Sequence, residues 1–156
     1  MADAHHHELS IFADYHQFYL QDETADGNLS DRWTDEAVRR LLALTDGTIG
    51  VGTVDNNEVA VTIDILSSAP AFDLEAWEHV TECSLAVPSG RIVVAGCTDY
   101  FPDARRIAVT PGVYRARISL ISPVSENSGA DVRERCRVQL WQSSEAGVRV
   151  LKSRSA

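Results

Sequence analysis

Cysteine, methionine and long apolar runs are scarce in this chain of 156 residues. The three cysteines are odd in number and widely spaced, which argues against a disulfide framework and a Cys-x-x-Cys zinc site. Free cysteine behaves as a small buried hydrophobe, so we expect reduced core thiols at Cys83, Cys97 and Cys136. No apolar run approaches the roughly 18 to 20 residues of a membrane span, and the N-terminus lacks the layout of a secretory signal. We therefore expect a cytoplasmic protein without a membrane span.

Local signatures of the common enzyme classes are also missing. The sequence has no Gly-x-Ser-x-Gly elbow, no His-Glu-x-x-His pair, no phosphate loop and no dinucleotide fingerprint. Glycines recur in segment 47–52, but it follows an expected helix and precedes an expected strand, the wrong order for cradling a phosphate. We interpret these glycines as admitting close backbone packing or a bulge. The sequence thus predicts neither an enzyme nor a cofactor, although catalytic carboxylates assembled from distant positions would leave no motif.

The histidines do not predict a metal site. Three of them are consecutive near the N-terminus, where their side chains point in different directions, and we expect residues 1–8 to be a flexible tail. A second flexible tail is expected over about residues 142–156. His16 follows Asp14 by two residues, as a ligand pair on a strand would. An ordinary hydrogen-bonded histidine at the surface or core edge is the favoured interpretation.

Basic residues are few in the first two thirds of the chain. Residues 1–100 contain 18 Asp and Glu against 4 Arg, whereas residues 101–156 contain 5 Asp and Glu against 10 Arg and Lys. A surface built from the first part would repel nucleic acid and attract an electropositive protein. If residues 1–100 and 101–156 interleave in space, acidic and basic side chains lie side by side and no acidic face forms.

Short β-rich runs separated by turn signals dominate the rest of the sequence. The expected strands are 9–20, 48–54, 58–66, 80–87, 91–98, 106–109, 113–121 and 133–141. The turn residues Asp55-Asn56-Asn57 predict that the second and third of these form a hairpin. The polar segment 123–131 predicts a flexible loop. We predict a single domain, residues 1–156, with a mainly β fold: an antiparallel β-sandwich of about eight or nine strands with one short α-helix.

Apolar and polar residues alternate most clearly in the run 58–66. Residues at every second position of a strand share one face of the sheet. The core-facing set is predicted to be Val59, Val61, Ile63 and Ile65. Asp64 should therefore face outward.

The one predicted helix begins after Trp33. Thr34 is suited to accept from the free amides of the first turn, and Asp35 and Glu36 favour the positive end of the helix dipole. Gly47 stands where a left-handed residue would end a helix of about three turns. The residues spaced to form its apolar face are Val38, Leu41, Leu42 and Thr45.

Two short strings suggest a particular family: Tyr15-His16-Gln17-Phe18, and Trp33-Thr34-Asp35-Glu36-Ala37 followed by Asp46-Gly47. With the expected strand, acidic loop and capped helix, they resemble the bacterial competence protein J family, whose members inhibit a DNA-entry nuclease. The resemblance includes the turn Pro111-Gly112-Val113-Tyr114 and covers about residues 9–141. It implies a function for this chain but supplies no set of inhibitory residues.

A nuclease inhibitor needs a surface that fits an electropositive cleft, because a nuclease must hold phosphates. Carboxylates can take the place of phosphates there and speed association by electrostatic steering. The candidate partner-binding residues are Asp22, Glu23, Asp26, Asp31, Asp35 and Glu36. From the residues alone these form a solvated loop and helix-capping charges; the resemblance supports the inhibitor. We predict a protein that binds and inhibits a bacterial nuclease without direct contact to nucleic acid. The oligomeric state stays open.

Two other functions remain open. The protein could be a binding module for a small ligand or a structural partner, using the aromatic residues Trp77, Tyr100 and Phe101, or an unrecognised enzyme. Arginines also alternate along two expected strands, on what we predict to be their solvated sides: Arg115, Arg117, Arg133, Arg135 and Arg137. Such rows can bind phosphate or a carboxylate surface. Pairing with acidic residues of neighbouring strands is the favoured interpretation.

Overall fold

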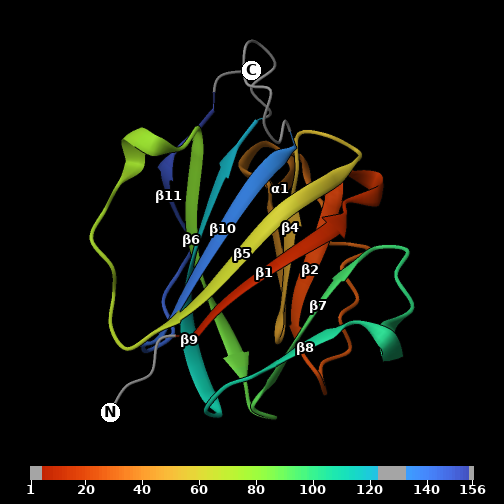
Figure 1. The fold of residues 1–156 in the computed structure, drawn as a ribbon, viewed down its shortest axis with the longest axis vertical. Coiled ribbons are helices and arrows are strands. Elements are labelled where there is room, and N and C mark those ends of the chain that lie inside the picture. The colour runs from red at the N-terminus through yellow and green to blue at the C-terminus, as the bar shows by residue number, and fades with distance from the viewer. Residues whose placement is uncertain (1–4, 123–132, 155–156) are drawn as a thin grey trace.

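The computed structural model describes residues 5–122 and 133–154, whose strands form two sheets packed face to face (Figure 1). In the order β1-β5-β10-β9-β6-β11, the larger sheet contains β1 (His5–Phe12), β5 (Glu58–Leu66), β6 (His79–Val87), β9 (Gly112–Ile121), β10 (Glu134–Gln142) and β11 (Arg149–Lys152). In the order β3-β4-β2-β7-β8, the smaller sheet contains β2 (Gln17–Asp22), β3 (Leu42–Thr45), β4 (Thr48–Gly52), β7 (Arg91–Gly96) and β8 (Arg105–Ala108). Helix α1 spans Asp35–Arg40.

The mainly β prediction is confirmed, but the strand count and the pairing differ from it. The described residues contain eleven strands, because β1, β3 and β11 were not expected as separate strands. Most neighbouring strands are antiparallel, whereas β10 runs parallel to β5, with Glu134 opposite Val59 and Trp141 opposite Leu66. The sandwich is therefore larger than predicted and not purely antiparallel.

A single large core cluster fills the space between the sheets. The inward residues of β5 are the predicted ones: Val59, Val61, Ile63 and Ile65. Phe18 and Leu20 of β2 are fully buried and contribute from the opposite sheet. Burying an aliphatic or aromatic side chain of this size contributes about 1.5 to 3 kcal/mol to folding. Asp64 lies on the opposite face of β5, where its carboxylate bonds His6 Nδ1 at 2.5 Å.

The predicted strand 9–20 is wrong, because the chain changes sheets in the middle of it. β1 ends at Phe12, a short 3-10 turn follows, and β2 begins at Gln17 in the other sheet. Tyr15 and His16 adopt the left-handed backbone region, with φ of 59° and 61°. No glycine or proline marks this corner. Because the residues on both sides favour strands, the sequence pattern did not indicate a corner here.

The predicted hairpin between 48–54 and 58–66 is also wrong. β4 belongs to the five-stranded sheet and β5 to the six-stranded sheet, so the segment between them crosses the sandwich. Buried Glu134 holds this crossing, since its carboxylate accepts from the amides of Val54 at 2.9 Å and Asp55 at 3.0 Å. Burial raises the pKa of Glu134, although the two amides oppose the shift.

The helix is shorter than predicted and ends without a glycine. The N-cap is confirmed, because Thr34 Oγ1 accepts from the amide of Ala37 at 3.2 Å. Leu41 adopts φ 58° and ends α1 after six residues, and the following residues form β3. Gly47, with φ 65°, lies instead in the turn between β3 and β4.

Both predicted tails contain strands. β1 begins at His5 and β11 covers Arg149–Lys152, although residues 1–8 and 142–156 were expected to be flexible. The prediction for 123–131 lies outside the described residues. Cys83 and Cys136 are buried free thiols, and burial raises the pKa of both. Cys97 is exposed after the end of β7, so its assignment to the core is wrong.

Candidate functional site

The acidic segment, residues 22–36, covers the outer face of the five-stranded sheet. Gly50 of β4 leaves room for it, because a Cβ there would lie 2.6 Å from Leu29 Cδ1 and 3.0 Å from Trp33 Cζ2. Leu29 is buried in a second apolar cluster with Ala37 and Ala43, against which Trp33 packs. The glycine is therefore explained by close packing, as the sequence indicated, and two apolar side chains fasten an otherwise polar segment to the sheet.

Four of the six candidate carboxylates lie on the exposed side of this segment. They are Asp26, Asp31, Asp35 and Glu36. Asp35 and Glu36 occupy the first turn of α1, where the helix dipole favours negative charge. Within the part of the chain that the structure describes, none of the four forms an ion pair. Their charges are thus directed to solvent on a segment that is itself anchored.

Asp22 is a structural residue in this fold. It is 1% exposed, and its carboxylate accepts from the amide of Ser89 at 3.0 Å and the hydroxyl of Ser89 at 2.6 Å. Thr24 donates its amide at 3.0 Å and its hydroxyl from the other side. Burial by itself would raise the pKa of Asp22, but the hydrogen bonds from Ser89 and Thr24 hold the pKa below its ordinary value. The side chain joins the base of the acidic segment to the β6–β7 turn.

Glu23 is neutralised by two arginines of the same sheet. Its carboxylate accepts from Arg91 Nε at 2.6 Å and from Arg106 Nε at 3.0 Å. The hydrogen bond from Arg91, followed by that from Arg106, lowers the pKa of Glu23. Sequence alone could not separate Asp22 and Glu23 from the exposed four, because their partners come from β7, β8 and a distant turn.

The outer face of the six-stranded sheet is charged but internally paired. Arg115 and Arg117 are 5% and 2% exposed, so their assignment to a solvated side is wrong. Both reach Glu82 on the neighbouring strand β6, with Nε to oxygen distances of 3.4 Å and 2.8 Å. The favoured interpretation, pairing across strands, is confirmed for these two. Arg133 and Arg135 are exposed.

A strap, residues 67–78, lies over this second face. Arg117 donates to the carbonyls of Pro70 at 3.2 Å and Ala71 at 3.1 Å. The carboxylate of Asp73 accepts hydrogen bonds from both terminal nitrogens of Arg137. The Arg117 guanidinium also lies 4.4 Å from the ring centre of Phe72. The strap thus meets arginines of the sheet with carbonyls, a carboxylate and an aromatic ring.

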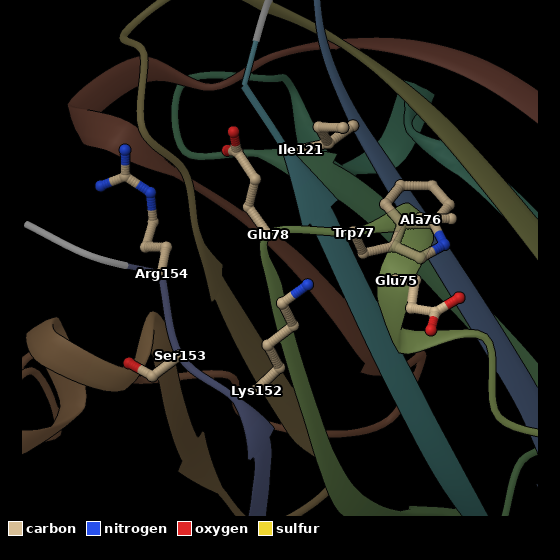
Figure 2. A pocket seen from close by; sticks show the side chains of 8 residues that line it. All are labelled: Glu75, Ala76, Trp77, Glu78, Ile121, Lys152, Ser153 and Arg154. Atoms are coloured by element: carbon tan, nitrogen blue, oxygen red, sulfur yellow. The ribbon is translucent and has the colours of Figure 1, made fainter.

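A pocket of about 410 Å³ lies between the strap and the end of β11 (Figure 2). Trp77 lines it, and Lys152 extends across it and donates to the carbonyl of Leu74 at 3.0 Å. Glu78 accepts from the amide and hydroxyl of Ser122. Glu78 and Lys152 of the lining are therefore already bonded within the chain, whereas Trp77 Nε1 and Arg154 Nε are buried without a hydrogen-bond partner among the described residues. Tyr100 lines a different cavity, so the structure does not bring the suggested aromatic residues into one ligand site.

Within residues 5–122 and 133–154, no group of three or more His, Cys, Asp and Glu side chains is arranged to hold a metal ion. His16 bonds the carbonyl of Val54 at 3.1 Å through Nδ1. None of the described helices has the length and apolar character needed to cross a membrane.

Comparison with known proteins identifies the fold. No protein-family model matches the chain, and no curated protein sequence matches it. ComJ from Bacillus subtilis, described as an inhibitor of the DNA-degrading activity of NucA, matches with a TM-score of 0.73 over 92% of this chain and 99% of its own, at 17% identity. The chain shares the ComJ fold. The protein of crocagin biosynthetic gene J also matches over 92% of this chain and 99% of its own, with a TM-score of 0.63 at 19% identity.

The residues that carry the resemblance to the competence protein J family serve the ComJ fold itself. Tyr15 and His16 make the corner between the sheets, and Phe18 enters the core. Gln17 accepts from the hydroxyl of Tyr19 at 2.6 Å. In the second string, Trp33 anchors the acidic segment and Thr34 caps α1, whereas Asp46-Gly47 turns the chain from β3 to β4. These motif residues therefore have structural roles in this fold, whereas Asp35 and Glu36 of the second string are exposed.

Proposed function

We propose that this protein binds a nuclease and inhibits it through the exposed carboxylates of the acidic segment. The observation that carries the proposal is the set of four exposed carboxylates at Asp26, Asp31, Asp35 and Glu36, which have no ion-pair partner among the described residues. A nuclease cleft is electropositive because it binds phosphates. Carboxylates held in front of such a cleft gain association rate by steering and exclude the nucleic acid.

The anchoring of the segment supports the same function. Association costs the ordering of loops and side chains, and a segment already fixed in the free protein avoids part of that cost. Leu29 and Trp33 fix the segment on the sheet, Asp22 and Glu23 fix its base, and Thr34 caps the helix that ends it. The exposed carboxylates are therefore presented by a preorganised element.

The similarity to ComJ supports a nuclease as the partner, since ComJ is described as an inhibitor of the nuclease activity of NucA. The crocagin gene J protein has the same fold, and its description names a biosynthetic gene. The fold is therefore compatible with more than one role, and the unpaired carboxylates favour the inhibitor.

An inhibitor is expected to be encoded beside its target, so the test uses a nuclease found among the genes that neighbour this one. Neutralising Asp31→Asn, Asp35→Asn and Glu36→Gln together should slow association about tenfold at low salt and flatten its dependence on ionic strength. Binding rates and inhibition of DNA cleavage are measured from low to physiological salt. Glu75→Gln, an exposed charge on the strap of the other face, is the control and should leave both unchanged.

Thermal stability of the triple variant is measured alongside, because Asp35 and Glu36 each favour the helix N-terminus by about 0.3 to 1 kcal/mol. Thr34→Ala separates the two effects: it should cost about 0.5 to 2 kcal/mol of stability while leaving the charge intact. Unchanged rate and salt dependence in the triple variant would remove the acidic segment from the interface. A purified protein that inhibits no such nuclease would overturn the inhibitor proposal itself.

A further inference from the structure

A groove of about 500 Å³ opens along the side of the sandwich where β1 of one sheet faces β8 of the other. Its lining is apolar at Leu9, Ile11 and Val94. Among the described residues, β1 pairs only with β5 and β8 only with β7. Both strands that flank the groove are therefore sheet edges, and a free edge offers unpaired backbone N–H and C=O groups to another chain.

Acidic side chains predominate around this β1–β8 groove. Glu8 lines it from β1, whereas Asp99 and Asp103 line it from the connection between β7 and β8. Arg105 is the one basic residue in the lining, and its guanidinium lies 3.3 Å from Nδ1 of His7 across the groove. Tyr100, 71% exposed, adds an aromatic surface at the rim. A cationic occupant with some apolar character fits this combination.

The rim formed by 99–104 is held in place before any partner binds. Arg106 Nη1 donates to the carbonyls of Phe101 at 2.9 Å and Ala104 at 2.8 Å, and its guanidinium lies 5.1 Å from the centre of the Phe101 ring. Its Nε bonds Glu23 at 3.0 Å. Asp99 accepts from the amide of Gly96 at 2.7 Å. These bonds fix the positions of the aromatic and acidic groups of the rim.

We propose that the β1–β8 groove binds an extended segment of a partner protein in which apolar and basic residues alternate. Such a segment pairs with the free edge of β1, the mode by which many proteins add a strand to an exposed sheet edge. Side chains of a strand alternate between its two faces. Every second residue then packs on Leu9 and the core edge at Ile11, and the residues between them carry cationic groups to Glu8 and Asp103. This inference does not depend on the identity of the partner as a nuclease.

The test uses a synthetic peptide of eight residues, the length of β1, in which valine and lysine alternate and both ends are blocked. Binding is followed by chemical shifts of the labelled full-length protein and by hydrogen exchange of the β1 amides. We expect saturable shifts in β1 and in 99–105, together with slowed exchange in β1. A matched peptide of alternating valine and glutamate should not bind.

Three further measurements separate the side-chain contacts of the peptide from its backbone pairing with β1. Glu8→Gln with Asp103→Asn should weaken binding of the lysine peptide about tenfold at low salt, and Tyr100→Ala about threefold, because exposed contacts of these kinds are individually modest. Methylating alternate peptide nitrogens on the pairing side should abolish binding. Glu75→Gln, on the strap of the other face, is the control and should bind the peptide as the parent protein does.

Several results would overturn the proposal. These are equal binding of the lysine and glutamate peptides, shifts confined to other surfaces, or full binding of the methylated peptide. A sedimentation experiment that finds a dimer dissociated by the peptide would assign the groove to a second copy of this chain instead. Because the nuclease assay uses a different surface and a different readout, failure of peptide binding leaves the inhibitor proposal to its own test.

Discussion

The two outer faces of this sandwich both carry a covering segment, and they treat charge in opposite ways. On the five-stranded sheet the acidic segment is fastened by the apolar side chains of Leu29 and Trp33, and its exposed carboxylates remain unpaired within the described residues. On the six-stranded sheet the strap is fastened by charge itself. Arg117 and Arg137 bind its carbonyls and Asp73, and Glu82 balances the arginines beneath it.

This difference separates charges that hold the structure from charges that are free to recognise a partner. Removing ions from water is expensive, so buried charges persist only where partners satisfy them. Exposed charges on a segment anchored by apolar contacts contribute little to stability, so they are available to bind a partner. The comparison therefore predicts large effects on stability from the strap face and small ones from the acidic carboxylates.

The largest effect is expected from Glu82→Gln. Glu82 is 5% exposed and faces both Arg115 and Arg117, so the neutral amide leaves two buried guanidinium groups without a counter-charge. Breaking a buried ion pair by removing one partner costs about 3 to 5 kcal/mol, measured as the free energy of unfolding in urea. Asp73→Asn is the matched control. Its carboxylate is 47% exposed, and its loss should cost no more than about 1 kcal/mol. Equal effects of the two variants would contradict the distinction between buried and exposed charges.

Leu29→Ala should have the second largest effect. It leaves a cavity under the acidic segment and should cost about 2 to 3 kcal/mol, toward the low end for buried leucine because the site lies in a small outer cluster. All carboxylates remain, so weaker inhibition at unchanged charge would show that anchoring contributes to binding. Stability equal to that of the parent protein would mean that the segment is not fastened by this residue.

His79→Gln tests the buried histidine that joins the start of β6 to the end of α1. His79 is fully buried: Nε2 donates to the carbonyl of Arg40 at 2.7 Å, and Nδ1 accepts from the amide of Arg154 at 3.3 Å. At neutral pH the substitution should cost about 0.5 to 1.5 kcal/mol for each hydrogen bond lost.

The pH dependence of stability gives a second measurement on His79. Burial lowers the pKa of His79 below 6.5. Just below that pH, His79 is therefore protonated in the unfolded chain but still neutral in the folded protein. Stability contributed by neutral His79 is therefore lost as pH falls from about 6.5 toward the lower folded pKa. Urea unfolding of both proteins at pH 7.5 and 5.5 should give a smaller pH effect in the variant. An identical pH effect in both would show that His79 is not held neutral.

The smallest effect is expected from Asp26→Asn with Asp31→Asn. Both side chains are exposed, and surface substitutions of this kind usually change stability by less than about 0.5 kcal/mol. A loss comparable to that of Asp73→Asn would indicate structural duties for these carboxylates. Thermal unfolding at low and high salt distinguishes the two cases.

The features that sequence predicted correctly depend on near neighbours in the chain. The N-cap at Thr34 needs only the amide of Ala37, and the alternation from Val59 to Ile65 needs only one buried face of a strand. The left-handed corner at Tyr15 and His16 was hidden because tertiary contacts impose it on residues with ordinary strand propensity. The same holds for Leu41, which ends α1 six positions before Gly47, the residue expected to end it.

The candidate site was predictable as a segment but not residue by residue. An acidic run is visible in the sequence, whereas the separation of buried Asp22 from exposed Asp26 depends on Ser89, which lies 67 positions further along. Glu23 likewise finds Arg106 only in the folded sheet. The pairing of Arg117 with Glu82 required knowing which strands are neighbours. Long-range partners decide which charges stay free.

The parallel pairing of β5 with β10 sets the order in which this chain can fold. β5 ends at Leu66 and β10 begins at Glu134, so the interior of the larger sheet closes only after most of the chain has left the ribosome. Until then β5 has an open edge of valine and isoleucine residues, the kind of surface from which aggregates grow. Contacts of such long sequence separation also slow folding relative to local ones. During synthesis, β5 therefore keeps an unpaired edge until the last third of the chain, which contains β10, has been made.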